Sequence, residues 1–211
     1  MTIDLPASLA DSWRALGTRT GESSVLLASI TAETTVYEPT DGADRLAALG
    51  ASEIPVRSLF TVDVTFSPSL SDLGMAPESA FEKAAPKAKS QFVTTLEDEG
   101  LRVDGTRNTL EFEATNGAEG SWFVLDAGYP VSPDLTAGED EWLDAEAHIA
   151  VWPTEASFGM AGGILPLEDG SDVVDGAGAT DGGELPAGLE VDPESDRETV
   201  ADLIRTIEPA G

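Results

Sequence analysis

The sequence predicts an α+β fold, a largely antiparallel sheet of about six strands with helices packed on its apolar side. Three observations predict it. Several segments alternate apolar and polar residues, the pair Asn116-Gly117 marks a tight turn between two of them, and other segments repeat apolar residues at helical spacing. Strands joined by tight turns run antiparallel. At 211 residues, the chain fits a single domain over 1–211 better than two.

The first half of the chain predicts a helix, a strand, a short helix and a second strand. A helical face over 4–16, closed by Gly17, is formed by Leu5, Leu9, Trp13 and Leu16. Residues 24–36 and 60–66 alternate as half-buried strands do. Between them, 41–49 can form a short helix that ends at Gly50.

The longest helical pattern covers 77–96. Pro86 lies inside this pattern, so we expect either a kink or two abutting helices. A meander of strands over 101–131 follows, with predicted turns at Asp104-Gly105 and Asn116-Gly117.

The last third predicts two strands, a loop and a docking helix. The strands are 142–152, which alternates most cleanly, and 157–165. Residues 168–192 are acidic and rich in glycine, which predicts a flexible loop. A capping box of Ser195 and Glu198 then begins a helix over 195–207.

The charge of the chain indicates adaptation to molar salt. Asp and Glu number 40 against 11 Lys and Arg, a net charge of -29, and only three residues are lysine. Like charges repel in dilute buffer, whereas a Debye length of about 3 Å at 1 M removes that repulsion. A disordered acidic protein is the alternative, but a hydrophobic content of 41% with periodic segments argues against it. We therefore expect an archaeal, cytoplasmic protein of an extreme halophile.

The same charge bears on partners and cofactors. A surface this negative is repelled by nucleic-acid phosphates and by anionic membranes, so we expect neither as a partner. The absence of cysteine excludes disulfides and thiolate metal sites. No cofactor motif is recognisable, and we expect no cofactor, an unknown protein partner, and a monomer or weak oligomer.

Asp144, Glu146 and His148 are the candidate metal-binding or acid–base residues. Their period-two spacing in a predicted strand places them on one face. Two carboxylates and an imidazole can ligate a divalent cation, and His148 is the only histidine. The alternative interpretation is a solvated polar face.

Two further groups are candidate binding residues. Lys83, Lys87 and Lys89 lie within seven residues of one predicted helix and form a candidate docking patch; the alternative is that they complement the helix dipole. The other group is a candidate exposed aromatic patch, with packing at the sheet edge as its alternative. Its members are Trp122, Trp142 and Trp152.

The end of the chain resembles the close of the PsbP-like α/β/α superfamily. The resemblance is architectural: a meander ends in a long strand, a strand carrying Phe158-Gly-Met follows, and the terminal helix reads Val-Ala-Asp-Leu-Ile-Arg-Thr-Ile-Glu-Pro. It covers about the last half of the chain, and it implies an accessory or binding domain, because that superfamily is largely non-catalytic. The composition also resembles that of haloarchaeal proteins. We therefore expect a non-enzymatic binding or accessory domain, with a metal-binding protein or metal-assisted hydrolase as the alternative.

Overall fold

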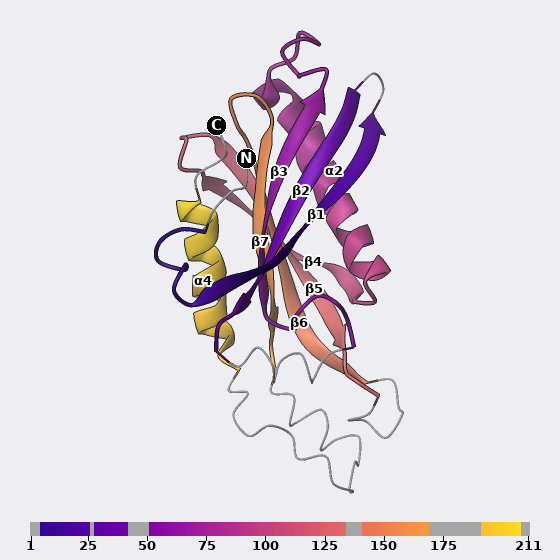
Figure 1. The fold of residues 1–211 in the computed structure, drawn as a ribbon, viewed down its shortest axis with the longest axis vertical. Coiled ribbons are helices and arrows are strands. Elements are labelled where there is room, and N and C mark those ends of the chain that lie inside the picture. The colour runs from indigo at the N-terminus through magenta and orange to yellow at the C-terminus, as the bar shows by residue number, and fades with distance from the viewer. Residues whose placement is uncertain (1–4, 26–27, 42–50, 134–140, 169–190, 208–211) are drawn as a thin grey trace, which may run out of the picture.

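The computed structural model describes residues 5–25, 28–41, 51–133, 141–168 and 191–207. Its centre is one antiparallel sheet of seven strands in the order β1-β2-β3-β7-β6-β5-β4 (Figure 1). The strands are β1 (Trp13–Val25), β2 (Ala28–Pro39), β3 (Ser58–Ser67), β4 (Arg102–Glu113), β5 (Glu119–Pro130), β6 (Trp142–Pro153) and β7 (Phe158–Pro166). The α+β class and the antiparallel sheet are confirmed, with seven strands in place of about six.

Helices lie on both faces of this sheet, although the sequence predicted them on one. The long helix α2 (Pro77–Asp98) packs on β6 and β4, and the terminal helix α4 (Pro193–Thr206) packs on β7 from the opposite side (Figure 1). The physical reason lies in the central strands, which are buried on both faces: in β6, Ile149 belongs to the core under α2 and Ala150 to the core under α4.

The predicted helix over 4–16 is wrong. Residues 7–12 form turns, and from Trp13 the chain pairs with β2 as the edge strand β1. Leu5, Leu9 and Trp13 do share an apolar environment, but they gather against the α4 core from a turn and a strand end. Leu16, the fourth member of the predicted helical face, is 49% exposed at an irregularity in β1. Cross-strand pairing therefore overrides the helical spacing.

The predicted turn at Asp104-Gly105 is also wrong, whereas the predicted turn at Asn116-Gly117 is confirmed. β4 continues through Asp104 and absorbs an irregularity in register there. Gly117 has φ +76°, a left-handed value that favours glycine, and the Asn116 side chain accepts a hydrogen bond from the Ala118 amide.

The long helix is continuous. α2 runs through Pro86 without a break, so two abutting helices are not formed. Pro86 lies on the exposed side of the helix. The short helix expected at 41–49 and the loop expected at 168–192 lie almost wholly outside the described residues.

Three glycines of β7 permit close approach to the neighbouring strands. A Cβ on Gly162 would lie 1.9 Å from the His148 carbonyl oxygen, and one on Gly159 would lie 2.4 Å from the Trp152 ring. On Gly163 it would lie 2.6 Å from the Ser58 carbonyl oxygen and 3.1 Å from Val200 of α4. The glycines therefore let β7 sit at the centre of the sheet under α4.

The N-terminus of α4 gives a first prediction. Asp192, not Ser195, is the N-cap, because the Asp192 carboxylate accepts from the Ser195 backbone amide at 3.1 Å. We expect Asp192→Ala to lower the free energy of unfolding by about 1 kcal/mol. Ser195→Ala, measured by the same thermal denaturation, should change it much less. If both variants lost the same free energy of unfolding, the result would instead support the capping box of Ser195 and Glu198 that the sequence predicted.

Candidate functional site

Glu146 and His148 are buried beneath α4 rather than solvated. The odd positions of β6 face α2, and the even positions face α4. Asp144, near the start of the strand, is exposed, whereas Glu146 and His148 are only 2% and 3% exposed. The solvated polar face that we considered for these residues is therefore wrong for two of the three. The reason is the second helix layer, which the strand pattern alone does not reveal.

Two arginines hold the Glu146 carboxylate. The Arg197 guanidinium of α4 donates to both oxygens, from Nε to Oε2 at 2.8 Å and from Nη2 to Oε1 at 2.9 Å. Arg107 of β4 donates to Oε1 and also to Asp126 of β5. The carboxylate is thus shared by a strand from the middle of the chain and the C-terminal helix, and it joins α4 to the sheet.

His148 completes this network and has a fixed tautomer. The Trp122 indole Nε1–H donates to His148 Nδ1 at 3.2 Å, so Nδ1 is the unprotonated acceptor. The proton therefore resides on Nε2, which lies 3.2 Å from Glu146 Oε2 and donates to it. Both ring nitrogens of His148 and both oxygens of Glu146 are engaged within the protein.

The environment of Glu146 stabilises its charged form. Burial by itself raises the pKa of this carboxyl, but hydrogen bonds from His148 and Arg197, together with the charge of Arg197, outweigh burial and lower the pKa to about 2. Glu146 is therefore ionised throughout the neutral range, as the anionic centre of a cationic clamp.

The geometry does not make a metal site of the three predicted residues. Within the described part of the chain, no group of three His, Cys, Asp or Glu side chains is arranged to hold a metal ion. The ligand positions that the sequence suggested at Glu146 are occupied by the two guanidinium groups. Sequence reasoning missed Arg107 and Arg197, which lie 39 and 51 residues from Glu146. No local pattern could have identified either of them.

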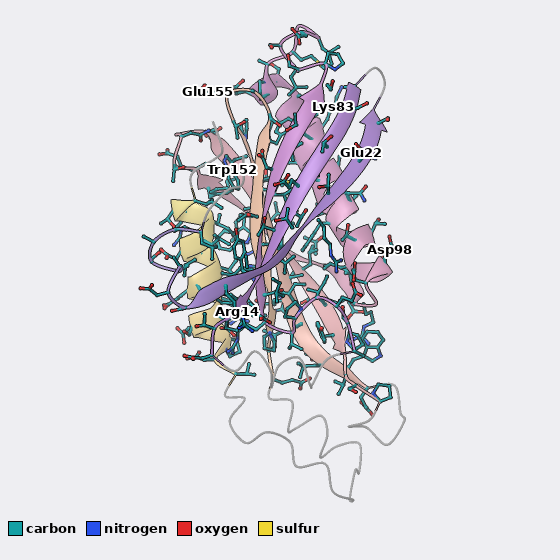
Figure 2. The ribbon with its side chains drawn as sticks, in the orientation of Figure 1. Arg14, Glu22, Lys83, Asp98, Trp152 and Glu155 are labelled. Atoms are coloured by element: carbon teal, nitrogen blue, oxygen red, sulfur yellow. The ribbon has the colours of Figure 1, made fainter. Side chains whose placement is uncertain are left out.

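The three lysines divide into two groups. Lys83 and Lys87 are exposed on the outer face of α2, where Figure 2 labels Lys83. Lys89 is half-buried, with Nζ 5.4 Å from the centre of the Phe123 ring and 3.3 Å from Thr106 Oγ1. Lys89 therefore packs α2 onto the sheet, and only the first two lysines are placed to meet a partner.

The helix surface around Lys83 and Lys87 differs in charge from the rest of the molecule. Residues 83–96 form the longest run in the sequence without Asp or Glu. The exposed residues of that run form the α2 outer face, namely Lys83, Pro86, Lys87, Ser90, Gln91, Thr94 and Thr95. In a chain of net charge -29, this face is weakly cationic, and the nearest carboxylates of the helix, the exposed Glu82 and Glu97, lie at its two ends.

The tryptophans do not form an exposed patch. Trp122 and Trp152 are 7% and 0% exposed, because both faces of β5 and β6 are covered. Trp142 is half-buried, and the Arg102 guanidinium lies 5.1 Å from the centre of its ring. Trp152 packs edge-on against Phe112, with ring centroids 6.0 Å apart. The three residues are packing elements of the sheet.

The sequence of the chain matches the model of one known protein family. Residues 14–208 match the family model described as Domain of unknown function (DUF6517). The chain belongs to this family. The DUF6517 match begins in β1 and continues through α4, so it includes the network around Glu146 and the α2 outer face. No curated protein and no solved structure matches the chain significantly. Among the residues that the structure of this DUF6517 chain describes, no helix is long and apolar enough to span a bilayer.

Proposed function

We propose that this DUF6517 chain is a non-catalytic binding or accessory domain that docks a partner protein through the α2 outer face. One observation carries the proposal. The longest carboxylate-free run of a strongly acidic chain falls on an exposed helix and contains all three lysines. An acidic partner is disfavoured on the carboxylate-rich remainder of the surface, and it finds complementary charge on this face.

Salt adaptation is compatible with such docking. We infer from the charge that the protein works in the molar-salt cytoplasm of an extreme halophile. There the Debye length of about 3 Å suppresses repulsion at a distance but leaves ion pairs in direct contact. Two acidic proteins can therefore approach and then be held where lysines meet carboxylates.

The layered architecture supports an accessory role of the kind found in the PsbP-like superfamily. Helix, sheet and helix form three layers in this chain, an arrangement compatible with the α/β/α resemblance. The polar groups of Glu146 and His148 are engaged with one another and with arginines, which supports a structural role for them. Two of the three residues that suggested a metal-assisted hydrolase are therefore already engaged within the protein.

A photo-crosslinking experiment tests the docking face. A photoreactive residue at Ser90, between the exposed lysines and Thr94, should crosslink a defined partner in the source cells. The same residue at Thr109, exposed on β4, is the matched control and should not. With the partner identified and purified, Lys83→Glu combined with Lys87→Glu should weaken its binding about tenfold or more in molar KCl.

The proposal has a clear contrary result. The docking face would lie elsewhere if the partner crosslinked equally at Ser90 and Thr109. The same would follow if Lys83→Glu combined with Lys87→Glu left the affinity for the partner unchanged. Circular dichroism of each variant ensures that a loss of binding is not a loss of fold.

A further inference from the structure

α4 leaves part of the β1–β3 half of its sheet face open. Among the strands, α4 packs on β7, and the core beneath it includes residues of β5 and β6 together with Tyr37 of β2 and Leu59 of β3. The opposite end of β1, β2 and β3 lies beyond that core. In Figure 1, β1 begins beside α4, and β1, β2 and the upper part of β3 then extend away from that helix, while α2 lies behind them. On the α4 side, this part of the sheet has no helix layer among the described elements.

The strand register assembles one type of chemistry on this open surface. Alternate positions of β1, β2 and β3 align in four rows. In the first row Thr35 and Thr61 are only 4% and 2% exposed, and Thr35 Oγ1 lies 3.2 Å from Thr18 Oγ1, whereas the members of the other three rows are exposed or half-exposed. We call these twelve residues the hydroxyl face. Its rows are Thr18–Thr35–Thr61, Thr20–Glu33–Asp63, Glu22–Thr31–Thr65 and Ser24–Ser29–Ser67.

The hydroxyl face is polar and anionic. Every member carries a hydroxyl or a carboxyl group, and none is a lysine, an arginine or an apolar residue. Glu22 is exposed near the tip of β1, where Figure 2 labels it, and Glu33 is half-exposed in the middle of the face. The surface therefore fits a cationic, hydrogen-bonding partner.

We infer that the hydroxyl face of one copy receives the α2 outer face of a second copy. The inference rests on the proposed function, since it names the partner of the same helix. The two surfaces are complementary in charge, because Lys83 and Lys87 of the second copy meet Glu22 and Glu33. The exposed Ser, Thr and Gln side chains of α2 supply donors and acceptors for the hydroxyl rows.

The dimensions also agree. Three strands about 4.8 Å apart give a surface roughly 14 Å wide, including half a spacing on either side. A helix with its side chains is about 10 Å across, so one helix fits beside α4 on this half of the sheet. The docked α2 thus completes the helix layer that α4 begins.

The contact is head-to-tail, with consequences for assembly. Each copy offers one α2 outer face and one hydroxyl face on opposite sides of its sheet. A heterologous contact of this kind closes into a ring or continues as an open chain. Association therefore extends beyond a dimer as the protein concentration rises.

Sedimentation velocity of the full chain in molar KCl tests the inference. The wild-type mass should rise above 21.9 kDa with concentration. Lys83→Glu with Lys87→Glu, and separately Glu22→Lys with Glu33→Lys, should each weaken association about tenfold or more. An equimolar mixture of the two variants should associate again, because each variant then meets a complementary face on the other. Glu111→Lys with Glu113→Lys, two exposed residues of β4, is the matched control and should behave as the wild type.

Each contrary outcome is distinct. A wild type that stays monomeric, variants that associate like the wild type, or a mixture that does not recover would each overturn the inference. If the wild type is monomeric but Ser90 still crosslinks a different acidic protein, the proposed function stands without self-association. If neither occurs, both proposals fail.

Discussion

Glu146→Ala is expected to lower the free energy of unfolding by about 3 kcal/mol, because the buried carboxylate accepts charge-assisted hydrogen bonds worth about 1.5–3 kcal/mol each, from arginines that are themselves 44% exposed. The substitution leaves Arg107 and Arg197 without their shared carboxylate and removes the acceptor for His148 Nε2. Because Arg197 belongs to α4, we also expect faster hydrogen exchange in that helix. Chemical denaturation and amide exchange in molar KCl measure the two effects.

This loss has a defined pH dependence. The pKa of Glu146 is about 2 in the folded protein against an ordinary value of 4.5, a difference worth about 3 kcal/mol. A lowered pKa means that the stabilisation is fully present above pH 4.5 and declines as the pH falls toward 2. The difference in stability between wild type and Glu146→Ala should therefore shrink over that interval.

Asp126→Ala is the matched control for the clamp. Asp126 also accepts from Arg107, but both side chains are about two-fifths exposed, at 39% and 44%. Such pairs contribute about 0–1 kcal/mol. Losses of similar size in Asp126→Ala and Glu146→Ala would show that burial under α4 does not set the strength of this network.

Lowering KCl from molar concentration to about 0.1 M is expected to unfold the domain. The Debye length lengthens from about 3 to about 10 Å over this range, so carboxylates on neighbouring parts of the surface begin to repel one another. With a net charge of -29, that repulsion acts against a stability of only about 5–15 kcal/mol. Far-UV circular dichroism during a KCl titration measures the transition.

A charge variant separates screening from other effects of salt. Replacing Glu111, Glu113 and Glu119 with lysine reduces the negative charge at exposed positions of the β4–β5 hairpin. Its unfolding midpoint should move to lower KCl than that of the wild type. A full folded signal of the wild type at low salt would refute the salt-adapted interpretation. If the triple variant instead unfolded at the same KCl concentration as the wild type, the salt dependence would have a cause other than net charge.

Much of the fold follows from local pattern in the sequence. β3, β6, β7, α2 and α4 were predicted close to their observed ranges, because periodic burial is encoded in neighbouring residues. The failures share a cause. The helix predicted at 4–16 gave way to pairing of β1 with β2, and the turn predicted at Asp104-Gly105 gave way to pairing of β4 with β5.

By itself, the sequence determined the α+β class, the acidic character of the chain, and the unusual composition of residues 83–96. These are properties of composition and of short-range periodicity. Only the tertiary structure decided that both faces of the central strands are covered, which buries Glu146, His148 and Trp122. It also decided which arginines meet Glu146 and which residues form the rows of the hydroxyl face. Both depend on strand register and helix docking, which join residues tens of positions apart and leave no local pattern.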